Sequence, residues 1–579
     1  MKITNAENVL MLISLLKEYR IKKVIASPGT MNIHFVGSIQ DDPFFDIYSA
    51  VDERSAAYMA CGMSAESGEP VCLSCTGATA SRNYLPGLTE AYYRRLPVIA
   101  ITSTQPQQLI GHHVPQVIDR RVQPNDTVCY SAYIKTIRCQ SDRWEDRIEI
   151  NKALICATEE GGGPVHINLE SPDDFVFEER PLPEVRRINY YTAVHQSDWP
   201  EIPNPGRIGI FIGNHRMMSK GLEESITTFC RKYNAVVFCD RTSNYFGPYR
   251  ILPALVMKQE QYASRLLDIR LLIHIGEVAG GQYPFCPKKV WRVSEDGAIR
   301  DTFQKLDSVF KSDETDFFRF YGADCGAVRD DYLREWKIEI GKMEYGLSDI
   351  PFSNIWMARQ TLPRIPKGFK LYLGILNTLR SWDYFDAKEK IPGYANTGGF
   401  GIDGGISSLV GGALSDPNVI HLGIFGDLGF FYDLNVLGNR HFPSNIRIVL
   451  VNNGRGFEFR KYNHPAGKFG EKADRYMAAG GHFGNQSPDL IRHFAGDLGF
   501  DYISCYNKEE YTQSMERLLD PGLQERPLLL EVFTDCRQEN EALSMVNNIR
   551  KDRRLKTLRL VKRLVGRGKI RRVKELIRR

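Results

Sequence analysis

The chain has 579 residues, of which 42% are hydrophobic and 25% charged, and its formal net charge is +5. That length exceeds what one hydrophobic core organises, so about three or four domains are expected. The composition excludes a disordered or fibrous chain, and no run approaches the ~20 uninterrupted apolar residues of a membrane-spanning helix.

The chain starts with polar residues ahead of a helical pattern, which is not typical of a cleaved signal peptide. Its twelve cysteines are scattered through apolar runs, as expected for reduced thiols in the cytoplasm. Cys72 and Cys75 form a CxxC pair, but no second pair at metal-binding spacing lies nearby. We therefore expect a cytoplasmic protein in which this pair is structural.

Residues 1–180 alternate helical and strand patterns in the manner of an α/β domain. The expected strands are 23–26, 47–51, 71–74, 98–102 and 165–169. A helical pattern with Glu53 near its start follows the second of these strands. A polar loop, QQLIGHHVPQVIDRR, holds His112, His113 and Gln116.

The rest of the chain divides into further blocks. A Pro- and charge-rich passage at 181–205 indicates an interdomain linker. A Rossmann-like α/β block at 206–340 and another at 350–545 follow. The pattern predicts an α/β fold built from three doubly wound parallel-sheet domains.

Two strands of the last block end in polar turns. The apolar run 421–425 ends in Gly426-Asp427, and the run 446–451 ends in Asn-Asn-Gly, which includes Asn453. Parallel strands linked by a helix end at the same edge of the sheet, so Asp427 and Asn453 are expected to be neighbours. Such oxygen ligands suit Mg²⁺. The alternative is an ordinary pair of turns, since both sequences are common there.

The same edge has features of a diphosphate site. Gly426 and Gly429 allow close approach of the backbone, and a helix starting near residue 430 would direct its amides there. Asn377 and Thr378 end another strand-like run at this edge and are candidate donors to a diphosphate.

The C-terminal residues 549–579 form a basic tail with a helical pattern. Residues 550–579 carry a net charge of +13, which leaves −8 for residues 1–549. A basic amphipathic helix suits an anionic membrane surface, so we expect peripheral attachment at the inner face of the membrane. A solvated tail or a partner-docking helix is the alternative. Nucleic-acid binding is not expected, because the body is acidic and lacks a recognition motif.

The Gly-Asp and Asn-Asn signature resembles the magnesium-diphosphate motif of thiamine diphosphate (ThDP) enzymes, although Leu428 replaces the usual glycine. It is most similar to the branch that contains the menaquinone-pathway synthase (SEPHCHC synthase, MenD) and acetolactate synthase. The segments ASPGT, DERSAAYMACGMS, CTGATASRNYLPGLTEAYYRRLPVIAITS and GGPVHINLESP occur in the order of this family. The resemblance spans residues 1–540 and is weakest in the middle block.

The resemblance implies a pyrimidine-binding domain at 1–180, a central domain and a diphosphate-binding domain, with ThDP and Mg²⁺ as cofactors. Asp427 and Asn453 would be metal ligands, and the backbone carbonyl of Arg455 a third. Ile402 would hold the cofactor in its bent form, although an isoleucine there could equally be core filler.

Glu53 is the residue that the resemblance places beside the aminopyrimidine of the cofactor, where a carboxylate favours the reactive tautomer. The alternative is a stabilising interaction with the helix dipole. The family shares its sites between subunits, so a homodimer or homotetramer is implied. Glu53 of one chain would then serve the cofactor held by Asp427 and Asn453 of another.

Gln116 matches a glutamine that related carboligases direct at the bound intermediate. His112 and His113 resemble the paired histidines of decarboxylase relatives, but they are displaced toward the N-terminus. The alternative for all three is a solvated polar loop.

The implied reaction is decarboxylation of a 2-oxo acid followed by addition of the resulting enolamine to an acceptor carbonyl. A simple 2-oxo acid decarboxylase is the first alternative. An inactive, membrane-tethered scaffold that kept the fold is the second, and the presence of Glu53, Asp427 and Asn453 together disfavours it.

The sequence departs from the menaquinone-pathway synthase at the cations that bind its acidic substrates, 2-oxoglutarate and isochorismate. Neutral residues stand at the matching positions, namely Met31, Gln105, Thr397, Gly281 and Gln282. Each lost charged hydrogen bond is worth about 1.5–3 kcal/mol, so we expect less anionic substrates than those of that synthase. Four residues past the metal loop are candidates for one carboxylate or phosphate, or are surface charges: Arg455, Arg460, Lys461 and His464.

Overall fold

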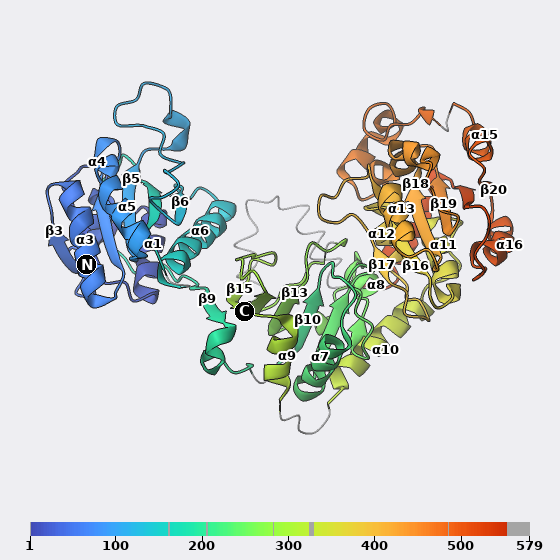
Figure 1. The fold of residues 1–579 in the computed structure, drawn as a ribbon, viewed down its shortest axis with the longest axis horizontal. Helices are drawn as coiled ribbons and strands as arrows, with labels where there is room; N and C mark the ends of the chain where they lie inside the picture. Colours follow the sequence, from blue (N-terminus) through green and yellow to red (C-terminus); the bar gives the residue numbers. More distant parts are fainter. Residues whose placement is uncertain are drawn as a thin grey trace. The chain divides into compact units, whose positions relative to one another are not determined.

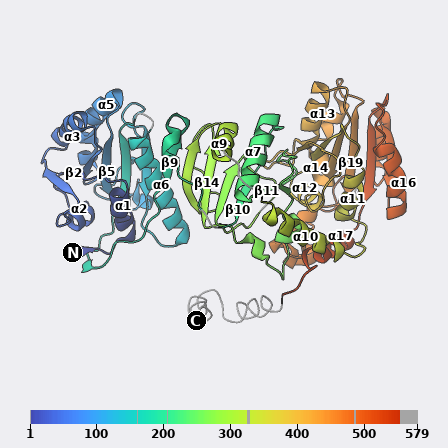
Figure 2. The ribbon, with the colours of Figure 1, turned by 90° about the horizontal axis from the view of Figure 1, so that it is seen from below.

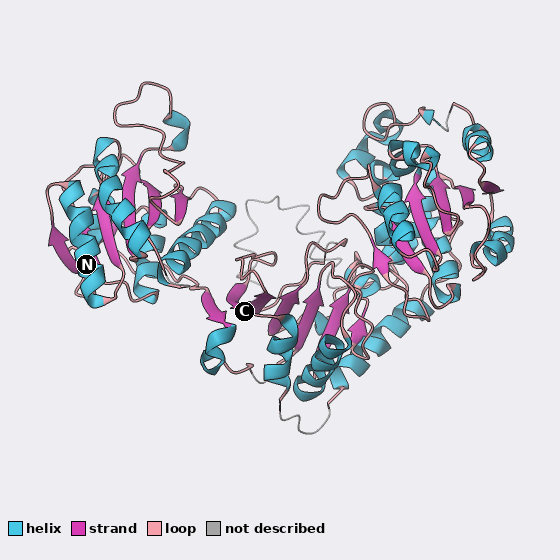
Figure 3. Cartoon of the chain, viewed as in Figure 1, coloured by secondary structure: helices cyan, strands magenta, loops and turns pink. Residues whose placement is uncertain are grey.

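The computed structural model describes residues 2–159, 162–203, 206–281, 283–323, 329–483 and 486–552. The contacts divide the chain into two units: residues 1–199 with 296–311, and residues 200–295 with 312 onward. Each unit contains parallel sheets between helices (Figures 1 and 3). The predicted α/β class with doubly wound parallel sheets is confirmed.

The N-terminal sheet has the strand order β3-β2-β4-β5-β7-β6, and all its pairs are parallel. These strands are β2 (Lys23–Ala26), β3 (Asp46–Ser49), β4 (Val71–Cys75), β5 (Val98–Thr104), β6 (Tyr130–Ile134) and β7 (Val165–Glu170). Residues of β4 and β7 are buried throughout, as expected for parallel strands covered on both faces. Strand β7 nevertheless alternates apolar and polar residues, and its polar side chains, His166, Asn168 and Glu170, are buried.

Helices cover both faces of this sheet (Figure 2). One apolar cluster lies under α1 and α6, and another under α3 and α5. The helices are α1 (Glu7–Glu18), α2 (Ile33–Ile39), α3 (Glu53–Ser67), α4 (Thr79–Asn83), α5 (Leu85–Arg94) and α6 (Gln140–Thr158). This packing places the start of α3 at the carboxyl end of β3.

The passage predicted as a linker contains regular structure of its own. Strand β8 (Phe177–Glu179) pairs antiparallel with β1 (Lys2–Thr4) just before it. Strand β9 (Asn189–Thr192) pairs in parallel with β15 (Leu306–Lys311), and a 3₁₀ helix follows at Ala193–Asp198. The domain bounds themselves stay a prediction.

The first strands of the second unit have the order β12-β11-β10-β13-β14, and all four neighbouring pairs are parallel. The elements are β10 (Ile208–Ile212), α7 (Lys220–Tyr233), β11 (Val236–Cys239), β12 (Arg250–Ile251), α8 (Ala254–Met257), β13 (Leu271–Ile275), β14 (Lys289–Ser294), α9 (Glu314–Gly322) and α10 (Asp331–Tyr345).

The last sheet has the order β17-β16-β18-β19-β21-β20, and all its pairs are parallel. Its strands are β16 (Lys370–Leu373), β17 (Gly393–Tyr394), β18 (His421–Gly426), β19 (Ile446–Asn452), β20 (Asp501–Cys505) and β21 (Leu528–Phe533). An apolar cluster under α13 and α14 covers one face, and the ring of Trp356 from α11 meets that of Tyr511 from α16 at 5.9 Å.

The helices of this part are α11 (Asn354–Thr361), α12 (Asn377–Trp382), α13 (Gly405–Ser415), α14 (Asp427–Tyr432), α15 (Leu490–Asp497), α16 (Lys508–Leu518) and α17 (Cys536–Asn547). Because β16, β18 and β19 are adjacent and parallel, the turns after them meet at one edge.

Across the residues that the model describes, no helix is both long enough and apolar enough to cross a membrane. The amphipathic helix predicted in the basic tail falls almost entirely on residues 553–579, which lie outside the described part, as does Gln282.

Candidate functional site

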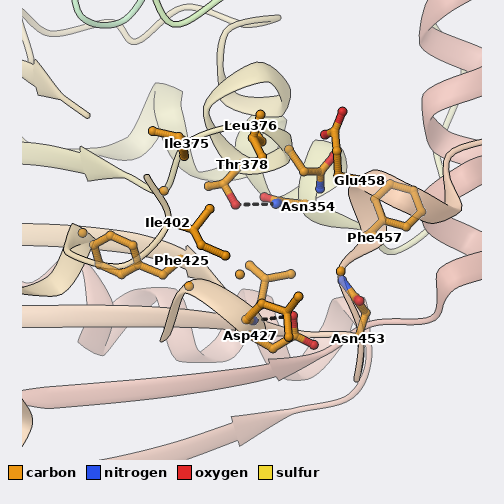
Figure 4. Close-up of a pocket in the computed structure, with 18 of the residues that line it drawn as sticks. Asn354, Ile375, Leu376, Thr378, Ile402, Phe425, Asp427, Asn453, Phe457 and Glu458 are labelled. Carbon is orange, nitrogen blue, oxygen red and sulfur yellow. Dashed lines mark hydrogen bonds between the residues drawn. The ribbon is translucent and has the colours of Figure 1, made fainter. Parts of the chain in front are cut away.

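A cavity opens at the carboxyl edge of the last sheet (Figure 4). We call it the strand-end cavity. Its lining comes from the segments after β16, β18 and β19, together with the loop that leads into α13. It therefore brings together the residues predicted here: Asn377, Thr378, Ile402, Gly426, Asp427, Gly429, Asn453 and Arg455.

Asp427 is a buried carboxylate, only 4% exposed. Its Oδ1 accepts the backbone N–H of Leu428 at 2.8 Å, and its Oδ2 accepts that of Arg455 at 2.9 Å. Burial raises the pKa of Asp427 to about 7, although backbone amides, including those of Asn453 and Gly454, oppose the shift. A cation would stabilise the ionised form at this position. Helix α14 begins at Asp427, earlier than the predicted start near residue 430.

Asn453 supplies a further oxygen to the cavity, and unlike the oxygens of Asp427 this one has no partner among the described residues. Its side-chain Oδ1 is buried and accepts no hydrogen bond from any residue that the model describes. An unsatisfied buried acceptor costs about 1–3 kcal/mol, so its retention points to a missing ligand. Figure 4 shows Asn453 and Asp427 on the same side of the cavity.

These oxygens pass a test of fit for Mg²⁺. A carboxylate and an amide oxygen are hard ligands of the kind this ion binds, and Mg²⁺ usually completes its shell with water and phosphate oxygens. The described residues contain no cluster of three or more His, Cys, Asp or Glu that could hold a metal. A site with one carboxylate and oxygens from other groups is consistent with that finding.

The glycines predicted for a diphosphate differ in their surroundings. A Cβ on Gly426 would meet no atom within 4 Å, which leaves open space beside the turn. A Cβ on Gly429 would lie 3.3 Å from the carbonyl oxygen of Ile402, so this helix passes close to the Ile402 loop. Ile402 itself lines the cavity (Figure 4).

A hydrogen-bonded chain that the sequence analysis missed positions Thr378. The Oγ1 of Thr378 accepts from the Asn354 side-chain amide at 3.1 Å, which leaves its O–H free to donate. The Oδ1 of Asn354 accepts from Trp382 Nε1 at 2.8 Å, and its backbone N–H donates to Glu539 at 2.9 Å. Burial raises the pKa of Glu539 to about 7. No local pattern connects these four residues, because they come from α11, α12 and α17.

The basic residues past the metal loop do not act together. Arg455 and Arg460 both donate to Asp474, at 2.6 and 2.5 Å. Lys461 instead pairs with Glu458, and the Nδ1 of His464 accepts the backbone N–H of Ala466. The two arginines therefore share one carboxylate, and Lys461 and His464 make separate contacts.

Glu53 is the first residue of α3, in the first unit. The neighbouring Asp52, which the sequence analysis did not single out, caps the helix by accepting from the backbone N–H groups of Arg54 and Ser55. Glu53 accepts from the side-chain amide of Asn83 at 3.1 Å. Because Asp52 performs the capping, the position of Glu53 is not explained by capping alone.

The predicted loop residues His112, His113 and Gln116 are exposed and belong to the same unit as Glu53. His113 and Gln116 have positive φ values of 56° and 63°, which are uncommon for residues with a Cβ. Among the described residues, none of these three side chains has a hydrogen-bond or ion-pair partner.

The chain is similar to known thiamine diphosphate enzymes. Residues 9–122 match the family model for the thiamine pyrophosphate enzyme N-terminal TPP binding domain. The chain is 27% identical over 559 residues to a 2-succinyl-5-enolpyruvyl-6-hydroxy-3-cyclohexene-1-carboxylate synthase of Bacteroides fragilis, covering 93% of this chain and 98% of that protein. Proteins of the same name from Phocaeicola vulgatus and Christiangramia forsetii are 28% and 29% identical, covering 93% and 90% of this chain and 98% and 95% of theirs.

Among solved structures, a thiamine diphosphate-dependent 4-hydroxybenzoylformate decarboxylase of Rhodococcus jostii RHA1 matches with a TM-score of 0.39 and 17% identity, over 92% of this chain and 99% of that one.

Residues 9–122 are thus similar to the N-terminal TPP-binding domain of thiamine diphosphate enzymes. The predicted cofactor is thereby confirmed, and Mg²⁺ is the usual partner metal in this class. The three relatives named above carry the same name, that of the SEPHCHC synthase to which the sequence was compared. They lend no support to the expectation that this chain differs from that synthase in its substrates.

Proposed function

We propose that this enzyme decarboxylates a 2-oxo acid and joins the remaining fragment to an acceptor carbonyl. The observation that carries the proposal is the unpartnered Oδ1 of Asn453 beside the buried carboxylate of Asp427, at the edge where three parallel strands end. Bound ThDP supplies a nucleophilic carbon and an electron sink for loss of CO₂.

The residues of the strand-end cavity bind and orient in this proposal. Asp427 and Asn453 hold Mg²⁺ through their side chains, and Arg455 through its backbone carbonyl. Gly426 leaves space for a diphosphate, and Gly429 lets α14 approach the Ile402 loop beside it. Asn377 and Thr378 donate to the diphosphate. Ile402 restricts the space in which the two rings fit. Two observations support these roles: the residues line one cavity, and the Thr378 hydroxyl accepts from Asn354 and can still donate its own hydrogen.

Glu53 activates the cofactor by exchanging a proton with its aminopyrimidine nitrogen. Since the family builds its sites from two subunits, we propose a homodimer or homotetramer in which Glu53 serves the site of a partner. The hydrogen bond from Asn83 fixes the carboxylate without neutralising it.

Gln116, His112 and His113 face the substrate in this proposal. The amide of Gln116 orients the acceptor carbonyl without carrying charge. The histidines exchange protons with the substrate. Their exposure in a single loop supports this role, because side chains that close over a substrate must be accessible beforehand.

The substrates carry less negative charge at the reacting end than those of the menaquinone-pathway synthase. Thr397, one of the positions where a cation is expected in that synthase, is 3% exposed and accepts from the Asn214 side-chain amide at 3.0 Å. It has no charge to offer an anion. The names of the relatives favour the opposite view, so the substrate screen must include the acids of that synthase.

The test is a product analysis with full-length protein, ThDP and Mg²⁺. Pyruvate and 2-oxoglutarate are supplied singly, and then with an aldehyde or with isochorismate, while CO₂ release and product masses are recorded. A product whose mass is the donor minus CO₂ plus the acceptor supports the proposal. Release of the plain aldehyde instead identifies a simple decarboxylase. No CO₂ from any donor contradicts both.

A further inference from the structure

A second cavity of about 640 Å³ lies in the second unit and shares the lining residues Asn377 and Glu458 with the strand-end cavity. We call it the lysine pocket. The side chains that define it here are Lys258, Glu260, Arg380, Tyr384, Glu458 and Lys461. Neither Lys258 nor Arg380 was singled out by the sequence analysis.

Glu458 lies between two cations in this pocket. Its Oε1 accepts from Arg380 at 2.9 Å, and its Oε2 accepts from Lys461 at 2.5 Å. Burial raises the pKa of Glu458, but the two cations outweigh it and hold the pKa below its ordinary value. One carboxylate thus balances two positive charges, and the trio carries a net positive charge.

Lys258 adds a third cation. Its Nζ lies 5.2 Å from the centroid of the Tyr384 ring, and its side chain makes no hydrogen bond or ion pair with any residue that the model describes. Burial lowers the pKa of Lys258 to about 8. An ammonium group in such a recess is destabilised unless an anion accompanies it.

The second carboxylate that lines the pocket, Glu260, binds other groups and not Lys258. Glu260 accepts from the Tyr462 hydroxyl at 2.6 Å and from the Asn463 side-chain amide at 3.3 Å. Tyr384 donates its hydroxyl to Asn547 at 3.0 Å. Glu260 is therefore held by neutral donors and makes no ion pair with Lys258. The carboxyl groups of Asp383 and Glu458 favour the charged form of Lys258, but among the described residues neither forms an ion pair with it.

We propose that the lysine pocket binds the anionic group, a phosphate monoester or a carboxylate, of an organic substrate whose reacting end lies in the strand-end cavity. This inference rests on the proposed function, which assigns the cofactor and the reacting end of the substrate to the strand-end cavity. The two ends of the substrate then meet different surroundings: the reacting end meets neutral lining residues such as Thr378 and Ile402, and one anionic group is bound by Lys258 with Arg380 and Lys461.

The experiment is calorimetry on full-length protein that has been saturated with ThDP and Mg²⁺, so that the diphosphate site is filled. Inorganic phosphate and succinate are titrated separately. Lys258→Met should weaken binding at least about tenfold, which corresponds to about 1.4 kcal/mol. Lys258→Arg should restore most of the affinity, because it keeps the charge. Lys337→Met, which removes an exposed lysine of α10, is the matched control and should bind as the unchanged protein does.

Binding of phosphate alone identifies a phosphate ester, and binding of succinate alone identifies a carboxylate. Absence of binding by both anions, or equal affinities in Lys258→Met and Lys337→Met, overturns the proposal. The affinity for ThDP is measured in a separate titration. If ThDP does not bind, that result counts against the proposed function only, because anion binding by the two lysine variants can still be compared without the cofactor.

Discussion

The backbone N–H of Arg455 donates to the Oδ2 of Asp427 at 2.9 Å and so joins the turn after β19 to the turn after β18. This bond holds the carboxylate from a segment outside its own helix. The other oxygen, Oδ1, is bound by the N–H of Leu428. Each oxygen keeps acceptor capacity, since an ionised carboxylate accepts about four hydrogen bonds or metal contacts.

The first prediction concerns these metal ligands. Asp427→Asn and Asn453→Ala should each weaken cofactor binding by two orders of magnitude or more, because each removes one oxygen from a site with few protein ligands. Calorimetric titration of ThDP in the presence of Mg²⁺ measures the effect. Asp497→Asn, an exposed position in α15, is the control. Unchanged affinity in both site variants would remove the metal assignment.

The second prediction separates activation of the cofactor from its binding. Glu53→Gln keeps the size of the side chain and the contact with Asn83, but it removes the acid. Exchange of the C2 proton of bound ThDP, followed by NMR, should slow at least about 100-fold, within the range of general acid–base effects. The affinity for ThDP should change less than fivefold. Glu66→Gln, exposed on the same helix, should exchange at the normal rate.

An unchanged exchange rate in Glu53→Gln would instead favour the reading of Glu53 as a residue that only stabilises its helix. Asp52 already accepts the backbone N–H groups of Arg54 and Ser55, so under this interpretation Glu53→Gln would lose only the dipole interaction of its charge, about 0.3–1 kcal/mol. The NMR experiment separates the two interpretations.

The sequence predicts contacts that follow from adjacent parallel strands, but it does not predict hydrogen bonds between side chains that are far apart in the chain. Asp427 and Asn453 were placed together because the parallel-strand rule needs only two apolar runs and the turns that end them. The bonds that link Asn354 to Thr378 and Glu539 connect residues 24 and 185 positions apart, and no local pattern marks them. Strand β9 was hidden in a Pro- and charge-rich passage, because its pairing with β15 is a tertiary effect that overrides composition.

The third prediction tests the space beside Gly426. A Cβ there meets no atom within 4 Å, so Gly426→Ala should leave the melting temperature of the cofactor-free protein unchanged or slightly higher. The new methyl group would occupy the approach of the diphosphate, and affinity for ThDP should fall about tenfold or more. Gly411→Ala in α13 also meets no atom within 4 Å. It should raise helix stability by about 0.5–1 kcal/mol without affecting the cofactor. Equal cofactor affinity in both variants would contradict the assignment of Gly426.

The fourth prediction uses Asp146, a carboxyl group of the first unit that lies far in sequence from any proposed ligand. It is fully buried in α6, its Oδ1 accepts the backbone N–H of Lys135 at 3.0 Å, and its Oδ2 has no partner among the described residues. Burial raises the pKa of Asp146 from 3.8 to about 8, with the backbone of Lys135 opposing and Glu145 adding to the shift. The folded protein therefore holds a proton that the unfolded chain releases near pH 4.

Because the folded state binds one more proton than the unfolded chain between about pH 4 and pH 8, the stability falls as the pH rises through this range. The contribution of protonated Asp146 to stability is complete below about pH 4, declines as the pH rises, and is lost above about pH 8. Asp146→Asn mimics the protonated form and should flatten this decline. At pH 8.5 it should be more stable than the unchanged protein by more than about 1 kcal/mol, since one pKa unit corresponds to about 1.4 kcal/mol. Thermal unfolding from pH 5 to 9 measures the effect, with exposed Asp173→Asn as control. Parallel pH profiles for Asp146→Asn and the unchanged protein would show that Asp146 is ionised throughout.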